Sequence, residues 1–257
     1  MEAYSGFAKS YDLFMDNVDY DAWAAYLHRI LQRMHVPDAG TVVELGCGTG
    51  NLTERLCRMG YRMIASDISE EMLSVADQKK EEAGLDILYL QQDMRELDMP
   101  IGAAAVICAC DGMNYILEEE ELLDVFTGVR KTLADGGIFV FDMNTEAKFR
   151  EIGESTIAEN REEGSFIWEN DYDEEQRLNC YALTLFLPEA ETGLFRKYEE
   201  EHWQRAYEPE QIQRLLREAG FEQIEAWDAF TENPAEEGSE RICFVAVRSN
   251  MQGVPQI

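Results

Sequence analysis

A short apolar run that leads into a glycine-rich turn constrains the fold of this chain more than any other feature. Residues 42–51 read Val-Val-Glu-Leu-Gly-Cys-Gly-Thr-Gly-Asn, with a glycine at every second position after the apolar run. The run has the composition of a strand, and residues 52–59 then have the composition of a helix. The first N–H groups of such a helix face the loop. A strand, a glycine turn and a helix start together form a nucleotide-type pocket.

The spacing of the glycines narrows the class of pocket. Gly46, Gly48 and Gly50 form the pattern G-x-G-x-G, with Asn51 where the dinucleotide fingerprint G-x-G-x-x-G has its third glycine. Glycine allows positive φ angles and lets a ligand approach the backbone. The spacing argues against a dinucleotide such as NAD, and a tight turn without a ligand is the structural alternative.

Strand-like and helix-like segments alternate along most of the chain. Five apolar segments have strand character: residues 41–45, 61–66, 86–90, 104–110 and 138–142. Helical patterns occupy residues 20–34, 52–59, 69–83, 118–133 and 210–219, and two last strands follow at 221–227 and 241–247. This alternation predicts an α/β fold, a doubly wound, Rossmann-like architecture with a mostly parallel sheet of seven strands.

The alternation is interrupted between residues 144 and 208. Residues 166–172, 178–187 and 194–203 are rich in aromatic and β-branched residues and read as strands of a small inserted antiparallel β subdomain. We therefore expect a Rossmann-like domain at 1–143 and 209–248, an insertion at 144–208 and a flexible tail at 249–257. Insertions at the carboxyl ends of sheet strands lie over the ligand crevice, which predicts a lid. A dimer interface or a plain decoration is the alternative.

The composition restricts partners and compartment. The 257 residues include 52 acidic and 22 basic ones, a net charge of −30, which makes nucleic acid an unlikely partner and favours a cationic small molecule. Six cysteines without a C-x-x-C pair predict free thiols in a reducing compartment and no metal site. The lack of a leader pattern and of a long apolar run predicts a cytoplasmic protein outside the membrane. The oligomeric state is not defined by the sequence.

Acidic residues follow successive predicted strands. Asp67 ends the second strand, where a carboxylate can accept hydrogen bonds from both hydroxyls of a ribose. Asp93 follows the third strand, where an acid can accept from an adenine amino group, and Met94 beside it could lie on the adenine face. The carboxyl ends of parallel strands share one edge of the sheet, so these groups predict an adenosine-type ligand there.

This ordered set resembles the class I S-adenosylmethionine (SAM) dependent methyltransferases. Residues 44–50 match the family's glycine loop, Asp67 and Asp93 match its two acids, and residues 111–115 look like the segment beneath the methionine part of SAM. The resemblance covers nearly the whole chain and implies SAM as cofactor and methyl transfer as activity. The cofactor-binding residues that it implies are Glu44, Gly46, Cys47, Gly48, Gly50, Asp67, Ile68, Asp93, Met94, Cys110 and Asp111.

The N-terminus is similar to that of one small-molecule subgroup of this family. Its pattern Tyr-x-x-Phe-Ala-x-x-Tyr-Asp-x-x-Met is matched by residues 4–15. In this subgroup the N-terminal tyrosines reach the cofactor, which here implies Tyr4 and Tyr11, and a β insertion follows the fifth strand. The resemblance implies a small-molecule methyl acceptor without identifying it.

Methyl transfer from a sulfonium is an in-line displacement, for which the protein aligns the nucleophile and excludes water. An amine or hydroxyl acceptor must also lose a proton, and the candidate catalytic residues are His202, Asp111 and Tyr115. The candidate substrate contacts are Asn114, Tyr115, Trp168, His202 and Trp203, with Tyr181 as a further aromatic wall. A core-packed or solvated histidine, and packing of these aromatic residues within the insertion, are the alternatives.

Two other functions are left open by the sequence. One is an NAD-dependent oxidoreductase on a related fold, against which the glycine spacing and the N-terminal pattern argue. The other is a SAM-binding sensor or assembly protein without turnover, because residues that bind a cofactor do not prove catalysis.

Overall fold

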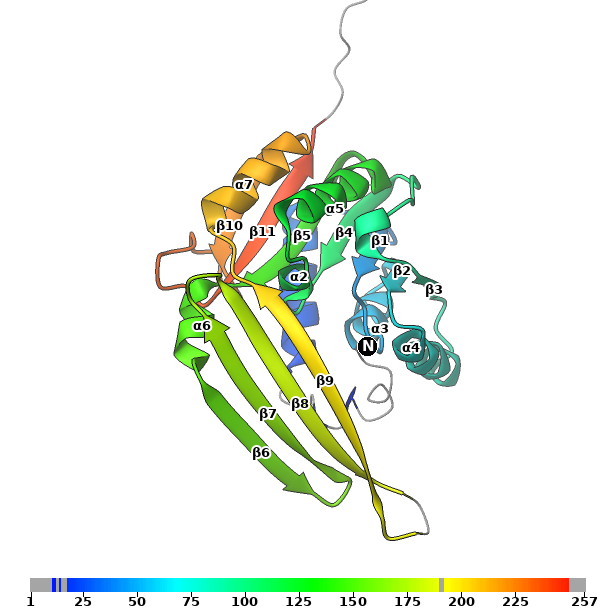
Figure 1. Ribbon diagram of the computed structural model, residues 1–257. Helices are drawn as coiled ribbons and strands as arrows, with labels where there is room; N and C mark the ends of the chain where they lie inside the picture. Colours follow the sequence, from blue (N-terminus) through cyan, green and yellow to red (C-terminus); the bar gives the residue numbers. More distant parts are fainter. Residues whose placement is uncertain (1–10, 13, 15–17, 190–191, 250–257) are drawn as a thin grey trace, which may run out of the picture.

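The computed structural model describes residues 11, 12, 14, 18–189 and 192–249 as two β-sheets with flanking helices (Figure 1). Sheet A has seven strands in the order β10-β11-β5-β4-β1-β2-β3. Their bounds are β1 Thr41–Leu45, β2 Arg62–Asp67, β3 Leu88–Gln91, β4 Ala103–Cys108, β5 Leu133–Asn144, β10 Phe221–Asp228 and β11 Arg241–Arg248. Strands β1 to β5 pair in parallel, whereas β11 runs antiparallel to both neighbours. The predicted mostly parallel, seven-stranded α/β fold is confirmed.

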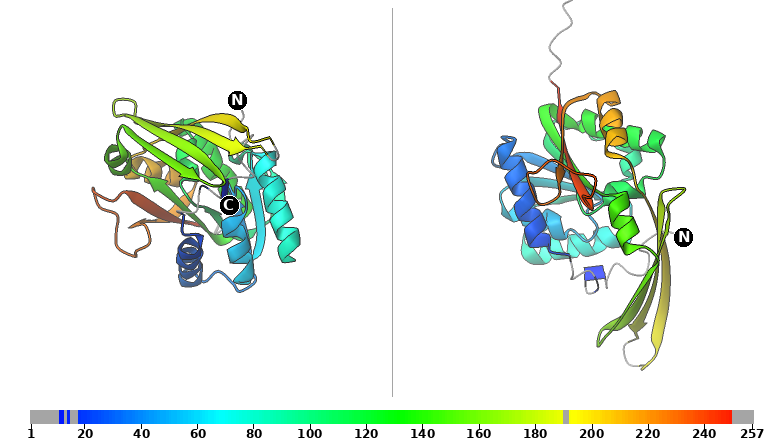
Figure 2. Two further views of the ribbon diagram at one scale, coloured as in Figure 1. Left: turned by 90° about the horizontal axis from the view of Figure 1, so that it is seen from below. Right: turned by 90° about the vertical axis from the view of Figure 1, so that its left-hand side faces the viewer.

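Helices cover both faces of sheet A (Figure 2). One face is covered by α2 (Tyr20–Arg33), α3 (Asn51–Arg58) and α4 (Glu70–Ala83), and the other by α5 (Glu119–Thr132) and α7 (Pro209–Glu218). Along β1, Val42 packs against the face covered by α2 and α3, and Val43 packs against the face covered by α5 and α7. They differ because successive strand residues point to opposite faces of the sheet. Of the helices that the structure describes, none has the length and apolar character that a membrane crossing requires.

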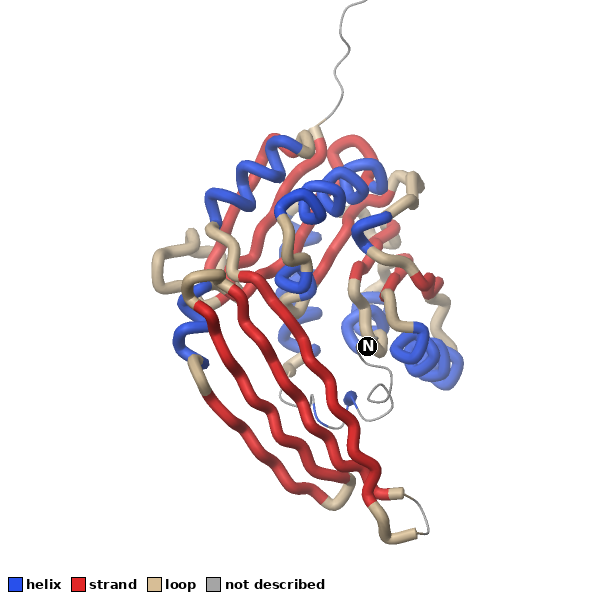
Figure 3. Tube along the Cα trace, in the orientation of Figure 1, coloured by secondary structure: helices blue, strands red, loops and turns tan. Residues whose placement is uncertain are grey.

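Sheet B is the predicted inserted antiparallel sheet, and it follows α6 (Glu146–Ile152). Its strands β6 (Ser155–Arg161), β7 (Gly164–Asp173), β8 (Leu178–Pro188) and β9 (Phe195–Arg205) are neighbours in chain order. Figure 3 shows them as four long strands that extend away from sheet A. The sequence indicated only three strands. It missed β6 because this exposed edge strand contains a single large apolar residue, Ile157, and so lacks an alternating pattern.

Strand β4 ends earlier than predicted, at Cys108 rather than at Cys110. Cys110 and Asp111 have φ angles of 60° and 56°, so the backbone leaves the extended conformation there and turns into the short helix η2 (Gly112–Tyr115). Two successive non-glycine residues in the left-handed region mark a locally strained backbone. This strain lies at the carboxyl edge of sheet A, where ligands bind in folds of this type.

Candidate functional site

The glycine loop joins β1 to α3 at the carboxyl edge of sheet A. Gly50 is the N-cap of α3 with a φ angle of 77°, and no side chain caps the helix there. A Cβ atom at Gly50 would lie 2.3 Å from the Tyr89 hydroxyl oxygen, so only glycine fits. The first N–H groups of α3 are therefore available to an anionic group of a ligand.

Glu44 and Cys47 support this loop from within the protein. Glu44 is buried at the end of β1 and accepts a hydrogen bond of 2.5 Å from the Thr53 hydroxyl of α3. Burial raises the pKa of Glu44 to about 8. Burial also raises the pKa of the Cys47 thiol. Both residues are expected cofactor contacts, and the structure places their side chains in the interior beneath the glycine loop.

Asp67 links the end of β2 to the glycine loop. Its carboxylate accepts hydrogen bonds from the Gly48 N–H at 2.8 Å and the Ser69 N–H at 2.9 Å. Burial raises the pKa of this carboxyl. Each carboxylate oxygen has a second lone pair, so Asp67 can still accept from two ribose hydroxyls. Ile68 beside it is 58% exposed and offers an uncovered apolar surface at the same edge.

Asp93 and Met94 follow β3 at the next position along this edge. Asp93 caps the short helix η1 (Met94–Glu96) and forms an ion pair of 2.6 Å with Arg95. This hydrogen-bonded pair lowers the pKa of Asp93. The Met94 methyl carbon lies 3.5 Å from where a Cβ on Gly46 would be, so its side chain lies beside the glycine loop. An adenine bound here would donate its amino group to the Asp93 carboxylate, which also pairs with Arg95.

Asp12 fastens the N-terminal segment to the glycine loop. Its carboxylate accepts from the Thr49 hydroxyl at 2.6 Å and the Asn51 amide at 2.7 Å, and it pairs with Lys79 of α4 at 3.0 Å. Lys79 also donates to Asn51 at 2.7 Å. The N-terminal segment thus contacts the loop directly, and Lys79 is a member of the site that the sequence analysis missed.

Tyr11 and Phe14, on either side of Asp12 in the chain, contact residues of sheet B. Phe14 packs edge-on against Phe166 of sheet B, with ring centroids 5.5 Å apart. Tyr11 packs against the same cluster and hydrogen-bonds with Tyr20, and burial raises its pKa. Tyr4, the other expected cofactor contact, lies outside the described residues. Tyr11, Asp12 and Phe14 therefore connect the glycine loop with sheet B.

The segment after β4 is held by an ion-pair network. Asp111 pairs with Arg241 at 3.0 Å and accepts from the Gln204 amide at 2.7 Å, so both carboxylate oxygens are engaged. Its N–H donates to Asp142, which is buried and also paired with Arg241. These bonds argue against Asp111 as a catalytic base, because protonation would weaken an ion pair. The same bonds hold the strained turn in place, together with Arg241, which the sequence did not indicate.

Asn114, an expected substrate contact, lies in the protein interior. Its side chain is completely buried. The amide nitrogen donates to the carbonyl oxygens of Asn144 and Arg205, at 3.0 and 2.9 Å, and the amide oxygen accepts from the Asn144 N–H at 2.9 Å. Such a satisfied, buried amide joins η2 to the ends of β5 and β9 and leaves no group for a substrate.

His202 and Glu200 lie on the same face of β9, the face of sheet B that contacts Tyr115 of η2. This face is called the inner face of sheet B. Their side chains are each 7% exposed and lie 3.2 Å apart, from Nε2 to a carboxylate oxygen. The Tyr115 ring meets His202 edge-on, with centroids 5.9 Å apart, and Tyr181 is the cross-strand partner of His202. Trp168 packs edge-on against Tyr181 at 5.3 Å. Tyr115, Trp168 and His202 are thus brought together, and Glu200 is a member that was missed.

Trp203 lies on the opposite face of sheet B. It is 42% exposed, and its indole N–H donates to Glu201 at 2.7 Å. Because successive residues of a strand point to opposite faces, Trp203 cannot share the inner face with His202. The expected substrate contact Trp203 thus lies on the face of sheet B opposite to His202.

Comparison with known proteins gives consistent matches. Residues 42–137 match the family model described as "Methyltransferase domain". A protein of Geobacillus sp. (strain WCH70) named "Putative methyltransferase" is 34% identical over 253 residues, 95% of this chain and 98% of the relative. The crystal structure of a SAM-dependent methyltransferase from Clostridium acetobutylicum is 29% identical with a TM-score of 0.84, covering 96% of this chain and 99% of that one. The sugar N-methyltransferase KedS8 from Streptoalloteichus sp. has a TM-score of 0.77 at 21% identity, over 93% of each chain.

Proposed function

Because this chain belongs to the class I SAM-dependent methyltransferases, we propose that it methylates a nitrogen or oxygen nucleophile on a small molecule. SAM supplies an activated methyl group on a sulfonium. The chain's own residues bind and align the two reactants, exclude water and accept the proton that the acceptor loses.

The arrangement that supports this proposal is the row of ligand-binding groups along the carboxyl edge of sheet A. We assign the open N-terminus of α3 to the carboxylate of SAM, Asp67 to its ribose hydroxyls, and Asp93 with Met94 to its adenine. The strained turn at Cys110 and Asp111 would lie under the methionine part, held by Arg241. Tyr11 and Asp12 would cover the cofactor from the N-terminal side.

We propose His202 as the general base, with Glu200 as its positioning residue. The pair lies inside sheet B, where a carboxylate at 3.2 Å can stabilise the imidazolium that forms when His202 takes a proton. Tyr115, Trp168 and Tyr181 supply aromatic surface around the pair. Buried carboxylate and aromatic groups favour a cationic acceptor such as an amine, and KedS8, which shares the fold, is named as a sugar N-methyltransferase.

We further propose that residues 144–208 form the substrate subdomain, with 1–143 and 209–248 as the cofactor domain. Its support is that the inner face of β9 carries His202, while β9 is joined to the cofactor edge through Gln204 and Asp111. The six cysteines are all free thiols, which supports a cytoplasmic, reducing compartment.

Two measurements test the function separately. Calorimetry with SAM should show binding that Asp67→Ala weakens and that Glu222→Gln, an exposed substitution on β10, leaves unchanged. Transfer from radiolabelled SAM to a metabolite extract should give a labelled small molecule, and His202→Gln should lower this turnover while SAM still binds. Binding of SAM without any labelled product would refute the methyltransferase proposal in favour of a sensor, and absence of binding would refute the site itself.

A further inference from the structure

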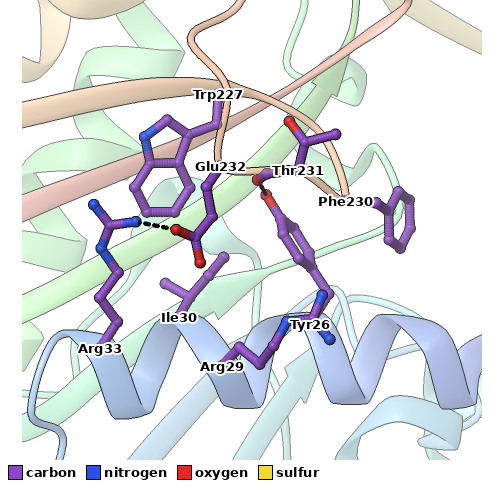
Figure 4. Close-up of a pocket in the computed structure, with 8 residues that line it drawn as sticks. All are labelled: Tyr26, Arg29, Ile30, Arg33, Trp227, Phe230, Thr231 and Glu232. Carbon is purple, nitrogen blue, oxygen red and sulfur yellow. Dashed lines mark hydrogen bonds and ion pairs between the residues drawn. The ribbon is translucent and has the colours of Figure 1, made fainter.

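A cavity of about 230 Å³ lies between the C-terminal half of α2 and the connection from β10 to β11 (Figure 4). Ile30 and Tyr26 form one wall and Trp227 and Phe230 the other, while Arg29, Arg33, Thr231 and Glu232 make the remaining half of the lining polar. The volume is somewhat below the roughly 300 Å³ at which drug-sized pockets begin, and it suits a ligand of one or two rings.

Arg29 gives this cavity a surplus positive charge. Arg33, the other cationic group of the lining, is neutralised by Glu232 at 2.9 Å and stacks over Trp227 at 4.8 Å. Arg29 is exposed and lies 5.7 Å from the centre of the Tyr26 ring, and within the described part of the chain no carboxylate pairs with it. The Arg29 guanidinium can therefore pair with the anionic group of a ligand.

Phe230 is held at the cavity in an unfavourable backbone conformation. Its φ angle is 64°, a region that bulky residues rarely adopt, and its side chain is 44% exposed. The ring is fixed from behind by Trp23 and Tyr26, at centroid distances of 4.5 and 5.2 Å. A strained residue that presents an aromatic ring to a cavity is typical of a binding site.

We propose that this cavity binds a small planar aromatic acid. The ring of the ligand would lie between the wall formed by Ile30 and Tyr26 and the wall formed by Trp227 and Phe230, and its carboxylate would accept hydrogen bonds from the Arg29 guanidinium. The lining shares no residue with the cofactor edge or with the inner face of sheet B, so the proposal does not depend on the identity of the methyl acceptor.

Calorimetry on the full chain with three probes tests the proposal. Indole-3-acetate carries both the ring and the charge, indole-3-acetamide carries the ring alone, and acetate carries the charge alone. We expect saturable binding of indole-3-acetate, at least about tenfold weaker binding of the amide, and no binding of acetate. The titration is repeated with saturating SAM, and binding of indole-3-acetate should persist because the two sites are distinct.

Arg29→Gln should weaken indole-3-acetate binding about tenfold, since a charge-assisted hydrogen bond is lost. Arg217→Gln is the matched control, because Arg217 is an exposed arginine on α7, which covers the other face of sheet A. No saturable binding of indole-3-acetate, equal binding to the Arg29→Gln variant, or loss of binding when SAM is present would each overturn the proposal.

Discussion

Glu44 allows a quantitative prediction of pH-dependent stability. Burial raises the pKa of this carboxyl from 4.5 to about 8 in the folded protein. The folded state therefore holds a proton that the unfolded chain has lost over this range. The stability contributed by this group is fully present below pH 4.5 and is lost as the pH rises toward 8, by about 1.4 kcal/mol per pH unit. Between about pH 5.5 and pH 7.5 the loss amounts to about 2 to 3 kcal/mol.

Glu44→Gln should remove this loss. The amide oxygen of glutamine can still accept the hydrogen bond from the Thr53 hydroxyl, so the contact between β1 and α3 is kept. We expect the free energy of unfolding of the variant, minus that of the natural protein, to increase by about 2 to 3 kcal/mol from about pH 5.5 to pH 7.5. Urea denaturation of the ligand-free protein, followed by circular dichroism across this range, measures the difference.

Glu222→Gln is the control for this experiment, because it removes an exposed carboxylate of β10. The free energy of unfolding of this variant should stay within about 0.5 kcal/mol of that of the natural protein at every pH. A difference for Glu44→Gln that does not change with pH would show that Glu44 is ionised in the folded protein throughout. That result would refute the reasoning, since the end of β1 would then have to be hydrated or paired with a cation.

Three further variants test other parts of the site. Asp12→Asn should weaken SAM binding by roughly fivefold in calorimetry, because the ion pair with Lys79 that orders the N-terminal segment is lost; an unchanged affinity would contradict a role for this segment. Asn114→Leu should lower the free energy of unfolding in urea by about 2 to 3 kcal/mol, because buried backbone groups lose their partners. Trp203→Ser should leave kcat/KM for methyl transfer within about twofold, since the side chain lies on the outer face of sheet B; a large loss would show that this face contacts the acceptor.

The fold could be predicted because its signals are local. Apolar strands, capped helices and glycine turns each specify their own element, and their alternation leaves few possible topologies. Edge strand β6 was missed because a strand with no buried face needs no apolar pattern. The end of β4 was misplaced because the turn at Cys110 and Asp111 uses two non-glycine residues with positive φ, which no composition rule predicts.

The site could be predicted only in part, because several of its contacts join residues that are distant in the chain. Lys79 is 67 residues from Asp12, and Arg241 is 130 residues from Asp111, so neither pairing leaves a local pattern. The expectation that Trp203 and His202 line one site is different, because the sequence alone argues against it. Adjacent strand residues point to opposite faces, so His202 and Trp203 could never have lined the same cleft.

The contacts between the two sheets explain how the inserted strands can keep a fixed position over the cofactor edge. At the base of sheet B, Asn114 bonds to β5 and β9, and Gln204 bonds to Asp111. Farther from sheet A, Phe14 packs on Phe166 while Asp12 is bonded to the glycine loop. The insertion is therefore attached at two places, through buried amide groups at its base and through Asp12 and Phe14 farther out. Releasing the first attachment would leave buried amide groups without partners, so we expect it to be the more stable of the two.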